Sequence, residues 1–509
     1  VRPDLPADAE TLAAVRAVCR RLDGLPLALE LAAVHVRTLS PQALLDRLTR
    51  RLPLLNAGPR DLPDRQRTMR ETIAWSERLL PPDEQRLFRQ LAVFAGGWSL
   101  PAAEEICALP GEPSNVLESL LALAEKSLVR AGAYGGEPRF SMLETVREYA
   151  QERLDASGET DALRRRHAEH FASLADVAAR IQPGQDERDR ALRIELPNAQ
   201  AALHWAQESD EPEVGLRLAA GFSRLWFVSG AISEAERWLR VFLALDAQAG
   251  ERAAPPTLRL AALFGATRCA LDRRDYADAE ARASEGLALA RRHTDAAGTA
   301  NMLAELGHVA EARGDQDAAW AHFEESLALA RTAGEGAAEG RALSSLGNLA
   351  RRRHDYARAT YYLEASLAHS RAYQLSWGVA SALVALGHVA CEQGDFDRAA
   401  DLYRESLGLY RTMPNPAWLA WCLEGVAVVA AARARHHEVA RLAGAVSARR
   451  SVALPDATPW PAYVEAGAHV RAALGEQAFE TAAAQGVLLS AEQAIAEALR
   501  ALAASSVVR

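Results

Sequence analysis

The segment 306-LGHVAEARGDQDAAWAHFEESLALAR-331 recurs as 346-LGNLARRRHDYARATYYLEASLAHSR-371 and as 386-LGHVACEQGDFDRAADLYRESLGLYR-411, so the copies begin 40 residues apart. Small residues fill two columns of this alignment: Gly307, Gly347 and Gly387, then Ala319, Ala359 and Ala399. Packed helices need small side chains where their backbones touch and large apolar ones at helical spacing. The repeat therefore predicts a helix–turn–helix unit. One unit cannot bury its own apolar face, so we expect the copies to stack into an α-solenoid.

Aspartates mark the turn inside each unit at the same interval, at Asp275, Asp315, Asp355 and Asp395. The unit is about six residues longer than the roughly 34-residue tetratricopeptide repeat. We predict tetratricopeptide repeats over 258–450, comprising four regular units and a fifth in 418–450. Divergent helical repeats are expected over 160–250, and a C-terminal helical cap over 451–509.

Composition places the chain among ordinary globular proteins. Its 509 residues are 49% apolar and 25% charged, with a formal net charge of −9. Such acidity argues against a chain dominated by nucleic-acid binding. Its five cysteines are scattered without Cys-x-x-Cys spacing, so neither a disulfide framework nor a zinc site is predicted and a cytoplasmic location fits best. No apolar run is long enough to cross a membrane, so we predict no membrane contact.

The sequence shows no pattern of catalytic residues. Of 58 lysines and arginines only Lys126 is a lysine, and no glycine-rich loop precedes it, so a G-x-x-x-x-G-K-[ST] phosphate loop is absent. His436-His437 has no companion at metal spacing. We therefore expect neither a metal nor enzymatic activity in this chain.

Upstream of the repeats, the pattern predicts a winged-helix domain over 68–158. Helical periodicity covers 68–80, 83–94, 99–109 and 114–127. Two short strands, 127–130 and 139–142, are then expected around the glycine-rich 131–138, followed by a helix over 144–157 that ends at Gly158. The predicted fold class is all-α with a minor β wing: a winged-helix domain followed by a tetratricopeptide-type α-solenoid.

The strings 19-CRRLDGLPLALELAA-33, 62-LPDRQRTMRETIAWS-76, 87-LFRQLAVFAGGWSL-100 and 139-RFSMLETVREYAQERL-154 resemble bacterial STAND regulators, signalling ATPases related to NB-ARC proteins that carry tetratricopeptide arms. The resemblance implies that 1–57 is the helical end of a nucleotide-binding module, where Gly24, Leu25 and Pro26 lie against the adenine of ATP or ADP. Leu143 stands where relatives carry a phosphate-contacting histidine. Val1 indicates a fragment or an alternative start, so we expect no cofactor in this chain and nucleotide binding only together with missing upstream sequence.

The first helices of the repeats supply the predicted partner-binding groove, because these helices line the concave face of tetratricopeptide arrays. The residues expected on it are Arg268, His308, Glu311, Asn348, Arg351, Arg352, His388 and Glu392. Arginines and polar side chains of this kind bind the carboxylate, phosphate or amide groups of a peptide or effector. The alternative is that these residues are merely solvated or pair with one another between repeats.

The leading hypothesis is a signal-transduction or transcription regulator. Its tetratricopeptide arm binds a protein or small effector and is coupled, through the winged-helix region, to a truncated or missing NTPase switch. The first rival is a stand-alone interaction scaffold without switching, and an enzyme ranks last. Direct DNA contact is not expected, and self-association remains open.

Overall fold

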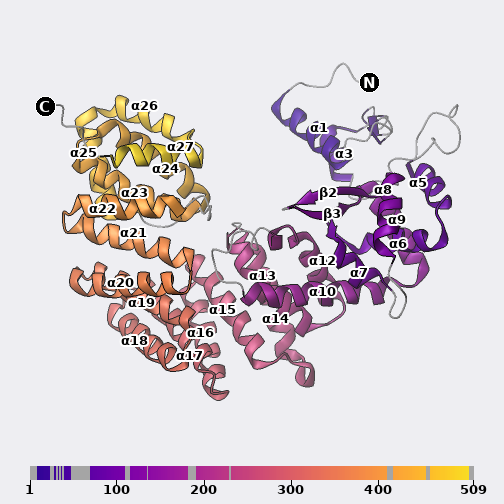
Figure 1. The fold of residues 1–509 in the computed structure, drawn as a ribbon, viewed down its shortest axis with the longest axis horizontal. Coiled ribbons are helices and arrows are strands. Elements are labelled where there is room, and N and C mark those ends of the chain that lie inside the picture. Colours follow the sequence, from indigo (N-terminus) through magenta and orange to yellow (C-terminus); the bar gives the residue numbers. More distant parts are fainter. Residues whose placement is uncertain are drawn as a thin grey trace. The chain divides into compact units, whose positions relative to one another are not determined.

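The computed structural model describes residues 8–22, 28–29, 32–33, 36, 39–47, 69–108, 115–134, 136–180, 191–228, 231–409, 416–453 and 459–503 (Figure 1). The predicted fold class is confirmed, since helices dominate and a single small sheet accompanies them. The chain forms two compact units: Val1–Asp176 with Ala191–Leu218, and Val177–Arg190 with Ala219–Arg509. Among the described helices, none is both long and apolar enough to span a membrane.

Two helices of the first unit precede the winged-helix region, α1 (Ala9–Arg21) and α3 (Pro41–Arg47). Each begins at a residue whose side chain caps it: Asp8 accepts a hydrogen bond from the backbone N–H of Thr11 (2.7 Å), and Ser40 from that of Ala43 (3.2 Å). The predicted start of α3 at Ser40-Pro41 is therefore confirmed.

The winged-helix region contains the five helices that the periodicity predicted. They are α5 (Met69–Arg78), α6 (Pro82–Gln90), α7 (Leu100–Cys107), α8 (Val116–Glu125) and α9 (Glu144–Ser157), with the 3₁₀ turn η2 (Leu91–Val93) after α6. Helix α9 ends at Gly158, whose positive φ of 73° is the left-handed conformation expected at this position. The core contains Phe88, Phe94 and Trp98, all fully buried, and the Phe94 and Trp98 rings stack with centroids 5.1 Å apart.

The wing differs from the prediction in length and in strand number. Strands β2 (Arg130–Tyr134) and β3 (Glu137–Ser141) form a tight antiparallel hairpin, so the stretch predicted as a loop is mostly strand. A third strand, β1 (Trp98–Ser99), pairs with β3 and gives the order β1-β3-β2. The prediction was wrong here because every residue of β2 is exposed and so shows no apolar alternation, and because two residues are too few to show any.

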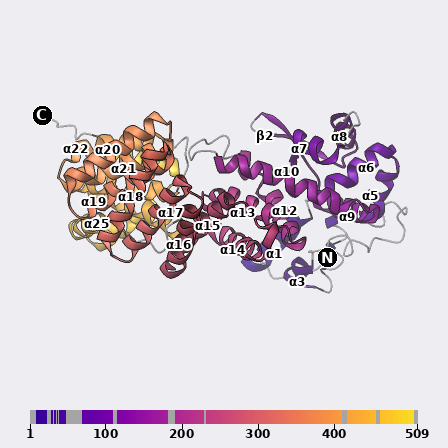
Figure 2. The same ribbon diagram turned by 90° about the horizontal axis from the view of Figure 1, so that it is seen from below.

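Helices α10 (Thr160–Arg180) and α12 (Leu196–Glu208) extend the first unit. Helix α10 lies beside α7 (Figure 2), where the Arg166 guanidinium donates to the carbonyl of Ala108 (2.7 Å). Asn198 at the start of α12 accepts from the backbone N–H of Ala95 (2.7 Å) and donates to the carbonyl of Gly97 (2.8 Å). These bonds fix α12 to the turn before β1.

The repeat arm is built from pairs of antiparallel helices. After α13 (Pro212–Val228), α14 (Ile232–Gln248) and the 3₁₀ turn η3 (Gly250–Arg252), the pairs are α15 (Pro256–Asp272) with α16 (Tyr276–Arg292), α17 (Ala296–Ala312) with α18 (Gln316–Ala333), α19 (Gly336–Arg352) with α20 (Tyr356–Ala372), α21 (Ser376–Glu392) with α22 (Phe396–Gly408), and α23 (Pro416–Ala432) with α24 (His436–Ala453). The four aspartates predicted to mark the turns cap the second helices: each carboxylate accepts the backbone N–H three residues later, at 3.0–3.1 Å.

Two columns of small residues hold the two helices of each repeat together. In the glycine column, a Cβ at Gly347 would lie 2.6 Å from Leu363, which explains the small residue predicted there. The second column holds buried serines of the second helix that bond the first helix of the same pair: the Ser326 hydroxyl donates to the carbonyl of Ala300 (2.7 Å), and that of Ser406 to Ala380 (3.3 Å). The serine column is visible in the sequence, but its role was not predicted.

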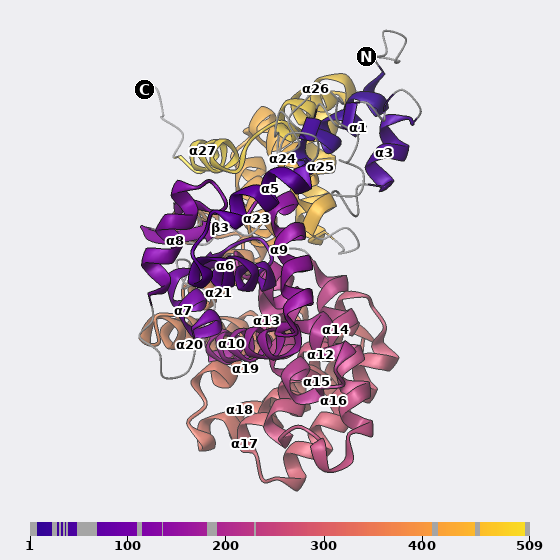
Figure 3. The ribbon, with the colours of Figure 1, turned by 90° about the vertical axis from the view of Figure 1, so that its right-hand side faces the viewer.

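The arm ends in helices α25 (Pro461–Leu474), α26 (Glu476–Val487) and α27 (Ala491–Ala501), in the region where a cap was predicted. Figure 3 shows them gathered with α24. The α24 and α26 backbones nearly touch: a Cβ on Gly444 would lie 1.9 Å from the carbonyl oxygen of Ala483, and one on Gly486 1.9 Å from that of Arg441.

Candidate functional site

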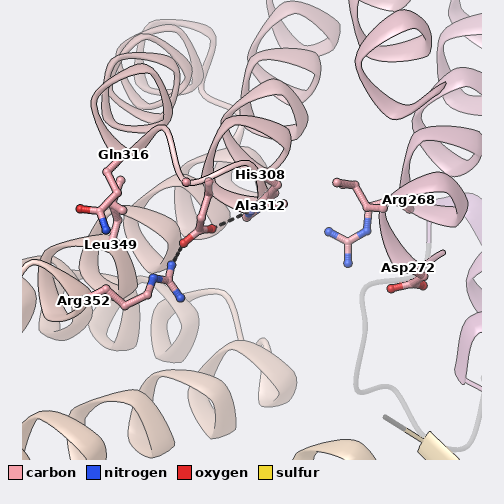
Figure 4. A pocket seen from close by; sticks show the side chains of 10 residues that line it. Arg268, Asp272, His308, Ala312, Gln316, Leu349 and Arg352 are labelled. Carbon is pink, nitrogen blue, oxygen red and sulfur yellow. Dashed lines mark ion pairs between the residues drawn. The ribbon is translucent and has the colours of Figure 1, made fainter. Parts of the chain in front are cut away.

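A polar pocket opens among the first helices of three successive repeats. It has a volume of about 470 Å³ and is lined by Arg268, Leu271 and Asp272 of α15, His308, Glu311 and Ala312 of α17, Gly314 and Gln316 of the next turn and helix, and Leu349 and Arg352 of α19. Figure 4 shows Arg268 and Asp272 on one wall, with His308 and Arg352 across the open space. The volume lies within the range of small-molecule sites.

The α15 wall carries two charged groups one helical turn apart. The Arg268 side chain is about half exposed (47%), and its nearest acidic atom is Glu305 Oε1 at 3.7 Å. Asp272 is exposed and forms no hydrogen bond or ion pair with the other described residues; partial desolvation raises the pKa of its carboxyl, and the nearby charge of Arg268 opposes this rise. This wall therefore presents one loosely paired cation and one anion to the pocket.

The opposite wall is already paired. Glu311 forms an ion pair with Arg352, and its other carboxylate oxygen lies 3.6 Å from His308 Nδ1. The His308 ring packs edge-on against Phe323, with centroids 5.0 Å apart. Burial lowers the pKa of His308 to about 4, so this histidine is neutral at physiological pH and contributes no charge.

Behind these walls lie two charged side chains, Glu305 and Arg341, that each lack part of their hydrogen bonding. Glu305 of α17 is 1% exposed, and its Oε2 has no hydrogen-bond partner among the described residues. The Arg341 guanidinium of α19 bonds the Asn301 side chain, but its buried Nε likewise has no partner there. A buried polar atom without a partner is costly, so each of these two atoms calls for a partner such as a water molecule, an ion or a ligand.

The C-terminal half of the predicted groove is covered by the chain itself. The Trp460 ring stacks on His388, with centroids 4.2 Å apart, and its indole N–H donates to Glu392 Oε1 (2.9 Å). The Arg351 guanidinium donates to the same oxygen (2.5 Å). The prediction that His388 faces an open groove is therefore wrong, because the residue is 9% exposed beneath the indole.

The predicted arginine pair does not act as a pair. Consecutive residues on a helix point about 100° apart, so Arg351 turns toward α21 and Arg352 toward α17. Arg351 and Glu392 are also mostly buried, with side chains 13% and 15% exposed. Asn348 bonds the carbonyl of Ser344 on its own helix (3.0 Å) and does not line the pocket. Of the eight predicted residues, the pocket brings together Arg268, His308, Glu311 and Arg352.

Sequence reasoning missed Asp272, Glu305, Arg341 and Trp460. A signal existed for Glu305, because residues 265, 345, 385 and 425 at the same repeat position are Gly, Ser, Ala and Gly. A glutamate in a column of small residues points to a local polar role. No repeat signal existed for Trp460, which lies outside the repeats.

The predicted nucleotide contact at Gly24, Leu25 and Pro26 lies outside the described residues. Leu143, at the position of the relatives' histidine, is the residue before α9. The following residue, Glu144, pairs with Arg147 (2.8 Å). Within the described part of the chain, no three His, Cys, Asp or Glu side chains come together as a metal site.

Acid is expected to destabilise the protein through three histidines that are neutral in the fold. Burial lowers the pKa of His308 to about 4 and those of His167 and His388 to about 3. The unfolded chain, with an ordinary histidine pKa of about 6.5, binds these protons first, so stability is complete above pH 6.5 and falls as the pH drops toward 3–4. We expect a loss of about 1–2 kcal/mol per histidine at pH 5.

Urea unfolding at pH 7 and pH 5 measures this effect. The raised carboxyl pKa values of Asp272 and Glu424 act in the opposite direction, but their shifts are smaller. A free energy of unfolding that stays equal at the two pH values would contradict the prediction.

Comparison with known proteins finds two matching domain families and related proteins. Residues 80–155 match a winged helix-turn-helix domain family, and residues 338–412 match a tetratricopeptide repeat family. The chain is 38% identical over 247 residues to a Mycobacterium tuberculosis protein named, provisionally, as an HTH-type transcriptional regulator. This match covers 48% of the chain and 28% of that relative.

A second M. tuberculosis protein, whose name states no function, is 38% identical over 173 residues, covering 34% of the chain and 44% of that protein. A Pyrococcus horikoshii STAND protein with a tetratricopeptide repeat sensor aligns over 94% of this chain and 74% of its own, at 14% identity and a TM-score of 0.45. The two domain matches and the homology to a helix-turn-helix-type regulator support the predicted resemblance to STAND-like regulators.

Proposed function

We propose that this chain is the sensing part of a transcriptional regulator, in which the α15–α17–α19 pocket binds a small effector and the winged-helix region transmits the event. One observation carries the proposal: the open part of the first-helix face is a polar pocket with one loosely paired arginine and one aspartate that has no ion pair, whereas the part near α21 and α23 is filled by Trp460. This favours a small molecule over an extended peptide lying along the whole groove.

A thermal-shift screen of metabolites tests the pocket. The double variant Arg268→Gln/Arg352→Gln neutralises two lining cations, and the matched control Arg291→Gln/Arg371→Gln neutralises two arginines of second helices, 56% and 53% exposed. We expect at least one ligand that raises the melting temperature of the wild type and the control but not that of the pocket variant. Ligands that stabilise all three proteins equally would show that the pocket is not the sensor.

Hydrogen exchange distinguishes this proposal from a stand-alone scaffold. In a coupled regulator, ligand binding at the arm changes amide protection in α5–α9, because the two sites share a coupling free energy. In a scaffold, the change in protection stays within the repeats around the pocket.

We further propose that the winged-helix domain acts through protein contacts and not by reading DNA. Helix α8 occupies the recognition position of the helix-turn-helix, yet its exposed side chains are Leu117, Leu121, Glu118 and Glu125. Lys126 at its end is paired with Glu84 (2.6 Å). A DNA-reading helix needs arginine or lysine against the phosphates and bases, and acidic side chains repel the duplex.

This second proposal predicts that adding the chain to a fluorescently labelled DNA duplex at physiological salt leaves the anisotropy of the duplex unchanged. Calorimetry with ADP or ATP is likewise expected to show no heat of binding, in keeping with the absent phosphate loop. Saturable DNA binding that is lost in Leu121→Glu would contradict the assignment of α8 to a protein interface.

A further inference from the structure

We propose that the α15–α17–α19 pocket is specific for a small zwitterion, a molecule with one ammonium and one carboxylate group such as an amino acid. This inference rests on the proposed sensing role of the same pocket and adds the chemical class of the effector. It follows from which charged atoms around the pocket still lack a hydrogen-bond partner.

Two carboxylates on the α15–α17 side of the pocket have oxygens without a hydrogen-bond partner among the described residues. Asp272 lines the pocket without a hydrogen bond or ion pair among the described residues, and the buried Glu305 has an Oε2 without a partner there. Glu305 lies behind the pocket lining, 3.7 Å from Arg268, and Asp272 lies one helical turn from Arg268 on α15, so both acids are close to the same arginine. A ligand ammonium has three donors and no acceptor, the set that two carboxylates require.

One positively charged hydrogen-bond donor, the Arg268 guanidinium, also lacks a close acceptor. The Arg268 guanidinium extends into the open space (Figure 4), and its ion pair at 3.7 Å is longer than a hydrogen bond. Arg352, on the opposite wall, is already paired with Glu311 and lines the same space. A ligand carboxylate between these arginines gains charge-assisted hydrogen bonds from the first and attraction from the second.

Ligands of other charge types satisfy only part of this arrangement. A simple anion meets Arg268 but is repelled by Asp272 and Glu305, which lie beside it. A simple cation meets the acids but is repelled by Arg268, Arg341 and Arg352. A neutral sugar can hydrogen-bond to both signs but leaves the buried Glu305 charge uncompensated, which is costly in a poorly solvated site. The presence of both acids and arginines around the pocket therefore favours a ligand that carries both charges.

Titration calorimetry on the full chain tests the class. The probes are the common amino acids, each hit being compared with its methyl ester, which lacks the carboxylate, and its N-acetyl derivative, which lacks the ammonium. Glucose and succinate are the neutral and anionic probes. We expect binding of at least one amino acid and a loss of about tenfold or more in affinity for each derivative.

Two variants assign the charges within the pocket. Asp272→Asn is expected to lower the affinity for the amino acid by about tenfold or more and to leave the affinity for its N-acetyl derivative unchanged. Arg268→Gln is expected to lower the affinity for the amino acid by a similar factor and to leave the affinity for its methyl ester unchanged. The control Asp317→Asn removes an aspartate whose side chain is 97% exposed and outside the pocket, and is expected to leave all affinities unchanged.

The outcomes separate this inference from the proposed function. Pocket-dependent binding of glucose or succinate, with no amino acid bound, overturns the zwitterion class and leaves the sensing role intact. If no probe and no metabolite of the thermal-shift screen binds in a manner that depends on Arg268 and Arg352, both proposals fail. Equal binding of an amino acid and its two derivatives also overturns the charge assignment.

Discussion

Replacing Glu424 by alanine is expected to lower the free energy of unfolding of the arm by about 3–5 kcal/mol, because it removes the buried carboxylate that pairs with the mostly buried Arg450. Glu424 of α23 is 1% exposed, and its carboxylate accepts from the Arg450 guanidinium (2.6 Å) and from the backbone N–H of Trp460 (3.3 Å). The Arg450 side chain is itself only 11% exposed, so water cannot replace the lost carboxylate.

The exposed pair between Arg371 and Glu405 provides the matched control. It also joins an arginine and a glutamate of two different helices (2.6 Å), but the two side chains are 53% and 50% exposed. Glu405→Ala is expected to cost no more than about 1 kcal/mol. Urea unfolding of both variants, followed by circular dichroism, measures the difference, and equal losses would contradict a special role for burial.

Glu424→Ala is also expected to loosen Trp460, which covers the C-terminal part of the predicted groove. The lost carboxylate is the acceptor for the backbone of Trp460, whose ring covers His388. We therefore expect faster hydrogen exchange in α21 and α25 of this variant but unchanged exchange around α15. The covered and the open parts of the first-helix face would then respond separately.

The solenoid was predictable because its determinants are local and repeated. Each unit carries its own helix caps, small contact positions and apolar stripe, and the copies reinforce the signal at one period. Asp315 and Asp355, for example, cap their helices as local chemistry requires, although the sequence identified them only as turn markers. The β wing was predicted less well, since β1 pairs with β3 across about 40 intervening residues and no local pattern encodes that contact.

The candidate site was predictable in its helix face but not in its partners. The repeat identified the first helices, and four of the eight predicted residues do line the pocket. Whether Arg351 or Arg352 faces that pocket depends on a rotation of about 100° that a column of sequence does not reveal. The covering of His388 depends on Trp460, which lies 68 residues along the chain from Glu392, its hydrogen-bond partner. Contacts of this kind are determined by tertiary packing.

Replacing Gly444 by alanine is expected to disrupt the docking of α26 on α24 and to cost about 3 kcal/mol or more. The added Cβ would lie 1.9 Å from the carbonyl oxygen and 2.8 Å from the carbonyl carbon of Ala483. These are backbone atoms of a helix, so no side chain can rotate away, and relief requires the two helices to separate. The same close approach recurs at Gly486 against Arg441, so a shift that relieves one contact loosens the other.

Gly467→Ala in α25 distinguishes this packing effect from the general preference of helices for alanine. A Cβ at Gly467 would meet nothing within 4 Å, so this variant is expected to be stabilised by up to about 1 kcal/mol. The two substitutions are chemically identical and both lie in the interior of a helix, α24 or α25, so helix propensity predicts the same sign for both, whereas interhelical contact predicts opposite signs. Melting temperatures that rise in both variants would mean that α24 and α26 do not approach as closely as the structure shows.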